Sequence, residues 1–143
     1  MVLEQVKGSY TVLRGGGYIP YFGFVMTRPD VIKDTPDLVQ QFVDGWAESM
    51  HWARQNKDEA AQITTRWVPG LDLAVTKKAS AFVRFDPRLT KAMLASLEDN
   101  NKLLLDQKKI KAPVEVSKAL DKSFVEKTAK QYPQFFTDLK PAE

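Results

Sequence analysis

The sequence predicts a mostly α-helical chain with a short two-stranded β element near its N-terminus. With 143 residues, of which 43% are apolar and 27% charged, the chain is long enough to bury the core of one domain. Aromatic and β-branched residues flank a glycine run near the start, whereas apolar residues recur with a helical period after residue 28. We therefore expect a β-containing segment in residues 1–27, a helical segment in residues 28–135 and a flexible tail in residues 136–143.

The two predicted strands are residues 10–14 (YTVLR) and residues 21–27 (YFGFVMT), separated by the glycines at 15–17. Aromatic and β-branched residues favour strands, and a glycine run favours a connecting loop. A two-stranded sheet is only marginally stable by itself. We therefore expect these strands to join a larger sheet, whose other strands lie outside this chain or come from a second copy of it.

The first long helix is predicted from its start signal and its apolar stripe. Thr35 is expected as N-cap, Pro36 as the first helical residue and Asp37 at the positive end of the helix dipole. From Leu38 to Met50, apolar residues follow at spacings of three and four, which makes one wide apolar stripe. This pattern is typical of an amphipathic helix that packs through one face.

Four later helices are predicted in the same way, each from a start signal or an apolar period. The first starts at Asn56, with Glu59 as capping-box partner, and stops at Pro69-Gly70. A second follows directly, with Val75, Ala79, Phe82 and Val83 on its inner face. The third starts at Asp86-Pro87 and is expected to reach Leu105, and the last starts at Ser123, with Glu126 as capping-box partner, and ends at or before Tyr132. Residues 108–113 are expected to form a loop between the last two.

The composition excludes several classes of function. There is no Cys and a single His, which excludes thiolate nucleophiles and metal sites built from thiolates or histidine clusters. His51 is therefore expected to be an ordinary imidazole, and we expect neither a metal, a cofactor nor an enzyme activity. The net charge of +3 is mild for a nucleic-acid binder of this size, so no nucleic-acid partner is expected. Neither a signal peptide nor a membrane span is predicted in this sequence.

Three stretches of sequence carry a family resemblance: YTVLRGGGYIPYFGFVMT at 10–27, RPDVIKDTPDLVQQFVDGW at 28–46 and WARQNKDEAA at 52–61. Their order resembles the C-terminal portion of the periplasmic solute-binding proteins of ABC importers, in the branch for nitrate, sulfonates, taurine and thiamine-precursor-like ligands. The similarity covers nearly the whole chain. Its motifs are helix caps and core positions, not catalytic signatures.

The resemblance implies an α/β fold of the type II periplasmic binding protein class. Residues 1–20 would then be the end of a second lobe, residues 21–27 the strand that crosses back between lobes, and the later helices would pack on a first lobe. Such proteins are longer than this chain, so the resemblance implies a fragment. It also implies a periplasmic location, a small ligand held between lobes that close by a hinge, and an ABC permease in the membrane as partner.

The candidate ligand-binding residues lie in and after the glycine run: Arg14, Gly16, Gly17, Tyr18, Tyr21 and Phe22. Glycines let backbone N–H groups approach an oxyanion, and an Arg guanidinium offers a fork to a sulfonate or carboxylate. The aromatic residues would line an apolar pocket wall. The alternative for the same residues is an ordinary glycine loop followed by core aromatics.

Two functions from different classes follow. The first is a non-enzymatic substrate-binding component of an ABC importer, for a small, anionic organic solute such as a sulfonate, or for nitrate or a related compound. The alternative is a self-folding helical domain that binds a protein through its 38–50 or 89–97 face. A thiamine-precursor synthase of the same fold is a weaker third reading, because its reactive residues are not visible here. A homo-oligomer through exposed apolar faces is expected if the apolar stripes lack partners.

Overall fold

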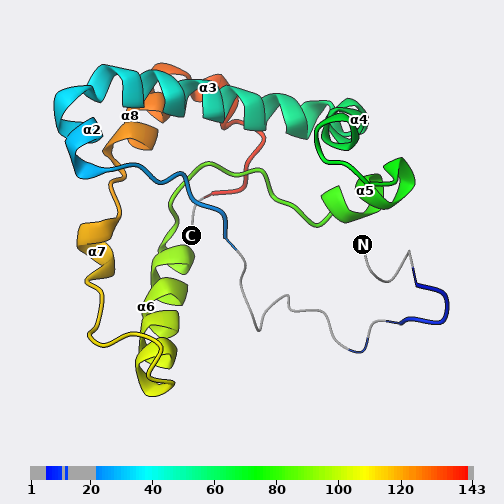
Figure 1. Ribbon diagram of the computed structural model, residues 1–143. Coiled ribbons are helices and arrows are strands. Elements are labelled where there is room, and N and C mark those ends of the chain that lie inside the picture. The colour runs from blue at the N-terminus through cyan, green and yellow to red at the C-terminus, as the bar shows by residue number, and fades with distance from the viewer. Residues whose placement is uncertain (1–5, 11, 13–21, 142–143) are drawn as a thin grey trace.

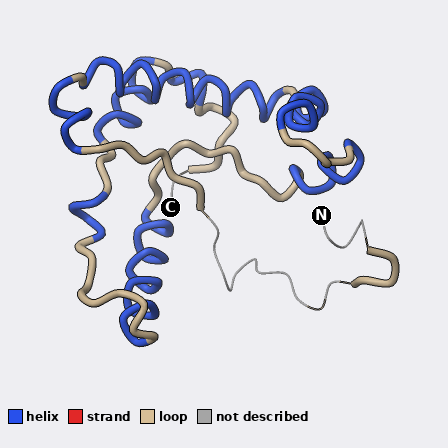
Figure 2. Tube along the Cα trace, in the orientation of Figure 1, coloured by secondary structure: helices blue, strands red, loops and turns tan. Residues whose placement is uncertain are grey.

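The computed structural model describes residues 6–10, 12 and 22–141 of the chain, and most of this part is helical (Figure 2). Seven α-helices and one 3-10 helix follow one another in this part. The α-helices, labelled in Figure 1, are α2 (Pro29–Asp34), α3 (Pro36–Gln55), α4 (Lys57–Trp67), α5 (Leu73–Ser80), α6 (Lys91–Asp106), α7 (Val116–Ala119) and α8 (Ser123–Gln131), and the 3-10 helix is η1 (Pro133–Phe135).

Helix α3 is the centre of the arrangement. It packs against α8 and also contacts α2, α4 and η1, so helices from early and late in the described chain meet on it. The pair of α4 and α5 pack against each other beyond the C-terminal end of α3 (Figure 1). Helix α6 packs against α7 and extends away from α3 and α8 (Figure 1).

The predicted long helix, with its start at Pro36 and its apolar stripe from Leu38 to Met50, is confirmed as α3, but its N-cap differs from the expectation. Pro36 is the first helical residue, as predicted. The Thr35 hydroxyl, however, donates to the Val31 carbonyl at 3.0 Å and makes no cap bond to α3. The reason is that Thr35 also ends α2, a helix that was not predicted, and both its hydroxyl and its backbone N–H donate to the Val31 carbonyl of that helix.

The junction between α3 and α4 also lacks the expected capping box. Asn56 separates the two helices, as the sequence predicts. Its side-chain amide donates to the Trp52 carbonyl at 2.9 Å, and its backbone N–H donates to the same oxygen at 2.8 Å. Asn56 therefore caps the C-terminal end of α3 and not the start of α4. Its side chain and its backbone N–H are both bonded to Trp52, so the expected capping box with Glu59 does not form.

One other predicted helix start is displaced by a local contact. Helix α6 begins at Lys91 with Thr90 as N-cap, because the Asp86 carboxylate accepts from the backbone and the guanidinium of Arg88 at 2.7–3.0 Å. Helix α8 begins at Ser123, as predicted, but the Ser123 hydroxyl donates to Asp121 at 2.6 Å and does not cap the helix. Its end before Tyr132 is confirmed.

The predicted fold class is wrong for the part that the structure describes. None of these residues forms a strand, including positions 10, 12 and 22–27 of the two predicted strands; positions 13–21 lie outside the described part. β-Prone residues form a strand only when a neighbouring segment supplies hydrogen bonds, and residues 22–27 have no such neighbour among the described residues. This part of the chain is all-helical, and the α/β expectation is not met.

The core of the described residues is small. Ala47, Ala61 and Val75 are its buried apolar residues, while many large apolar side chains are exposed. Exposed large apolar side chains include Leu38 at 60%, Phe42 at 55% and Trp67 at 83%. Much apolar surface of the described residues is therefore uncovered. No helix in residues 22–141 has the length and apolar character that a bilayer span requires.

Candidate functional site

The predicted ligand-binding residues fall mostly outside the described part of the chain. Arg14, Gly16, Gly17, Tyr18 and Tyr21 all lie outside the described residues. Phe22 is described and is half-buried, with its ring centroid 6.4 Å from that of Phe24 and the two rings tilted by 57°. This contact fits either a pocket wall or an ordinary aromatic pair.

The most connected polar side chain in the structure is Arg54, near the C-terminal end of α3. Its guanidinium donates to both carboxylate oxygens of Asp138, at 2.8 and 2.9 Å, and to the carbonyl of Phe135 at 2.6 Å. It also donates to the carbonyl of Phe85. Because its side chain is only 11% exposed, these contacts are largely shielded from water. One residue of α3 thus ties together two segments that lie far away in the sequence.

Arg54, Asp138 and His51 form a cluster, and the hydrogen bonds and charge of Arg54 explain the titration of the Asp138 carboxyl. Hydrogen bonds from Arg54 lower the pKa of the Asp138 carboxyl from 3.8 to about 2; burial opposes this shift, and the positive charge of Arg54 and a bond from His51 reinforce it. His51 Nδ1 lies 3.5 Å from Asp138 Oδ1, and its ring centroid is 5.8 Å from that of Phe135. Since the guanidinium is bound to protein acceptors on several sides, it is not open to an anionic solute.

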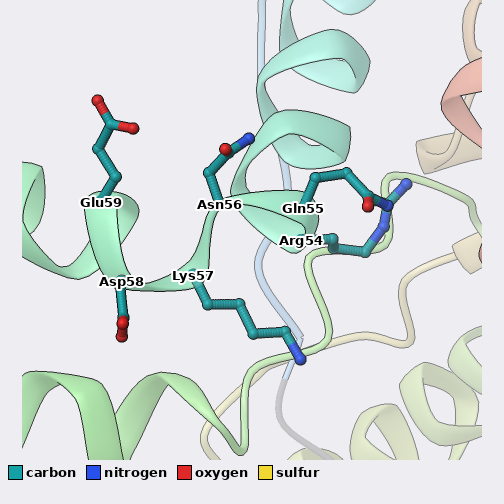
Figure 3. A pocket seen from close by; sticks show the side chains of 6 residues that line it. All are labelled: Arg54, Gln55, Asn56, Lys57, Asp58 and Glu59. Atoms are coloured by element: carbon teal, nitrogen blue, oxygen red, sulfur yellow. The ribbon is translucent and has the colours of Figure 1, made fainter.

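A hollow of about 560 Å³ lies where α3 passes into α4, lined by Arg54, Gln55, Asn56, Lys57, Asp58 and Glu59. Figure 3 shows that the side chains of Lys57, Asp58 and Glu59 point in different directions and do not converge. Asp58 is paired with Lys77 Nζ at 3.0 Å. The adjacent carboxylates of Asp58 and Glu59 therefore do not form an acid–base pair.

A groove of about 500 Å³ runs between α3 and the segment that follows α8. Its lining residues are Gln41, Asp44, Gly45, Glu48, Tyr132, Gln134 and Phe135. The rings of Tyr132 and Phe135 stack in it with centroids 5.3 Å apart. The sequence pattern did not indicate this groove, because its two walls are formed by segments far apart along the chain.

A buried polar network joins α3 to α8 beside this groove. The Thr128 hydroxyl is fully buried, donates to Asp44 Oδ1 at 2.6 Å and accepts from the Gln40 amide at 2.9 Å. The same amide donates to Asp44 at 2.8 Å and to the Phe124 carbonyl at 3.2 Å. The spacing of Gln40 and Asp44 by four residues is the one sequence signal for this network.

No group of His, Asp and Glu among the described residues is placed to hold a metal ion. Among the described side chains, His51 contacts Arg54, Asp138 and Phe135, none of which is a hydroxyl or thiol nucleophile that its imidazole could activate. Comparison with protein-family models, with curated proteins and with solved structures finds no match to this chain.

Proposed function

We propose that this chain is part of the substrate-binding component of an ABC importer and helps to hold a small, anionic organic solute such as a sulfonate, or nitrate or a related compound, during transport. The single observation that carries the proposal is the helix pair α3–α4. The resemblance rests on residues 10–27, 28–46 and 52–61. Residues 28–61 form α2, α3 and the start of α4, and α3 and α4 are separated only at Asn56. The order of helices in the chain thus supports the resemblance.

In this proposal, Arg14 binds the anionic group of the solute. A guanidinium pairs with sulfonate and carboxylate oxygens through two parallel bonds, and the glycines beside it let backbone N–H groups approach. Arg54 does not compete for this role, because Asp138 and two carbonyls occupy it. The permease partner and the periplasmic location belong to the same proposal and follow from the resemblance alone.

The alternative, a helical interaction domain that folds by itself, is less well supported. A self-sufficient domain needs a core, and the buried apolar residues of the described part are Ala47, Ala61 and Val75. Small side chains such as these contribute little hydrophobic stabilisation compared with Leu or Phe. The described helices therefore fit a portion of a larger assembly better than an independent domain.

Thermal melting with a panel of sulfonates, nitrate and aromatic carboxylates tests the proposal. A ligand that binds only the folded chain raises its melting temperature in proportion to the logarithm of ligand concentration above Kd. We expect one class of anion to do so, and Arg14→Gln to remove the effect while Arg84→Gln, at an exposed position, retains it. A melting temperature that no anion raises, in any oligomeric state of the chain, would contradict the proposal.

A further inference from the structure

The side of α3 that points away from α8 is apolar. Leu38, Phe42 and Trp46 are 60%, 55% and 40% exposed, respectively, and the rings of Phe42 and Trp46 stack with centroids 6.4 Å apart. Together with three more positions they form what we call the outer face: Leu38, Phe42, Gly45, Trp46, Ser49 and Trp52. At about 100° per residue these six positions fall within roughly 120° of the helix circumference.

The outer face alternates large and small residues. Gly45 and Ser49 lie among the four large side chains, and a Cβ added at Gly45 would meet nothing within 4 Å. The Ser49 hydroxyl donates to the Gly45 carbonyl at 2.7 Å, so it needs no further partner when it is covered. The face thus has projections and depressions, with its polar group already satisfied.

We propose that the outer face of α3 is a dimer interface, on which α3 of a second copy of this chain packs in the antiparallel direction. A twofold axis passing between Gly45 and Trp46 places Trp46 against Gly45 of the partner subunit and Phe42 against Ser49 of the partner subunit. The same axis brings Leu38 next to Trp52 of the partner subunit. The large side chains of Trp46 and Phe42 then lie against the small residues of the partner subunit, so two identical outer faces fit together.

The charges beside the outer face agree with this direction. Gln41 and Glu48 lie on one flank of it, and an antiparallel pairing places the Gln41 amide beside Glu48 of the partner subunit, where it can donate a hydrogen bond. The positive end of each α3 dipole also lies near the negative end of the other. A parallel pairing would instead bring like ends and like carboxylates together.

The outer face is long and exposed enough to take part in a specific interface, which buries about 800 Å² on each partner. Its large side chains Leu38, Phe42 and Trp46 are 60%, 55% and 40% exposed. The outer face extends over about 21 Å of helix, at 1.5 Å per residue. This inference does not rest on the proposed function, since it uses only the surface of α3.

Sedimentation velocity over a wide range of chain concentration tests the dimer. We expect a monomer–dimer equilibrium, and we expect Gly45→Arg to raise the dimer dissociation constant about tenfold or more, because the new side chain fills the depression that receives Trp46 of the partner subunit. The matched control is Gln62→Arg, which adds the same charge at an exposed position on α4. Circular dichroism should show unchanged helix content in both variants, because Gly45 has free space around it.

Cross-linking gives a second readout that does not depend on affinity. The chain has no Cys, so Gly45→Cys introduces a single thiol next to the twofold axis. Mild oxidation should link Gly45→Cys chains into covalent dimers and leave Gln62→Cys chains unlinked. A chain that stays monomeric at every concentration, a Gly45→Arg variant that dimerises like the parent, or equal cross-linking of the two Cys variants would each overturn the proposal.

Discussion

Two sides of helix α3 differ in a way that is uncommon for a surface helix. The side that packs against α8 is joined to it by the buried hydrogen bonds of Gln40, Asp44 and Thr128, whereas the opposite side exposes Leu38, Phe42 and Trp46. A helix that lies on a finished domain usually shows the reverse pattern, with its apolar stripe inside. The comparison indicates that polar contacts position α3 and α8 relative to each other, while the apolar side is available for association.

The largest expected loss of stability comes from removing Arg54, on the polar side of α3. Arg54→Ala removes the bonds to Asp138 and to the carbonyls of Phe85 and Phe135, which leaves partly buried acceptors without a donor. We expect the free energy of unfolding to fall by about 2–4 kcal/mol, measured by urea denaturation. Arg84→Ala, at an exposed position, serves as the control and should change it by less than about 0.5 kcal/mol. Equal losses in the two variants would contradict this role of Arg54.

A smaller effect is expected at the seam between α3 and α8. Thr128→Val keeps the shape of the side chain but leaves Asp44 and Gln40 without the Thr128 hydroxyl, so we expect a loss of about 1–3 kcal/mol in urea. The matched control is Thr64→Val on α4, because that hydroxyl donates to its own helix at an exposed position. If both substitutions cost the same, the seam network does not stabilise the packing of α8.

Lowering the pH should gradually weaken the contact between Arg54 and Asp138 and reduce the free energy of unfolding. The pKa of Asp138 is about 2 in the folded chain and 3.8 as the ordinary value, so the unfolded chain binds this proton first. The stabilisation is therefore complete above the ordinary value and is lost as pH falls through the folded value. The effect should be smaller than that of Arg54→Ala, because the carbonyl bonds of Arg54 remain. Urea unfolding at several pH values should show a steeper acid decline for the parent chain than for Asp138→Asn.

The smallest effect on the monomer is expected on the apolar side. Phe42→Gln should change the unfolding free energy of the dilute chain by less than about 0.5 kcal/mol, because the ring is 55% exposed and packs mainly on Trp46. At high concentration the same substitution should weaken association. Denaturation at two chain concentrations separates these effects. A large loss in the dilute chain would show that the outer face already stabilises the monomer.

Local sequence patterns predicted most of the helices. They did not predict every helix start or the two strands. The helix at 36–55 was predicted because its start signal and its apolar period agree. The start at Asp86 was misplaced because Arg88 binds that carboxylate. The start at Ser123 is confirmed, although its hydroxyl binds Asp121 and does not cap the helix. The strands were wrong because strand formation depends on a neighbouring segment and not on composition alone.

The site was less predictable than the helices. Arg54 reaches Asp138 across 84 positions of sequence, and no local spacing indicates such a contact. Gln40 and Thr128 are likewise 88 positions apart. The residues proposed to bind the anion, with Arg14 first among them, remain a prediction because they lie outside the described residues, apart from Phe22.

The position of α6 implies that the chain does not open as one unit. Helix α6 has no buried residue, and its C-terminal half is tied by Asn101, whose side chain both donates to and accepts from the backbone of Val114, at 2.8 and 3.1 Å. Amide hydrogens in α6 should therefore exchange with solvent through local opening, together with the segment up to Val114. Those of α3 near Ala47, where the helix is buried, should exchange more slowly. The backbone hydrogen bonds of α6 are therefore expected to open more often than those of α3 near Ala47.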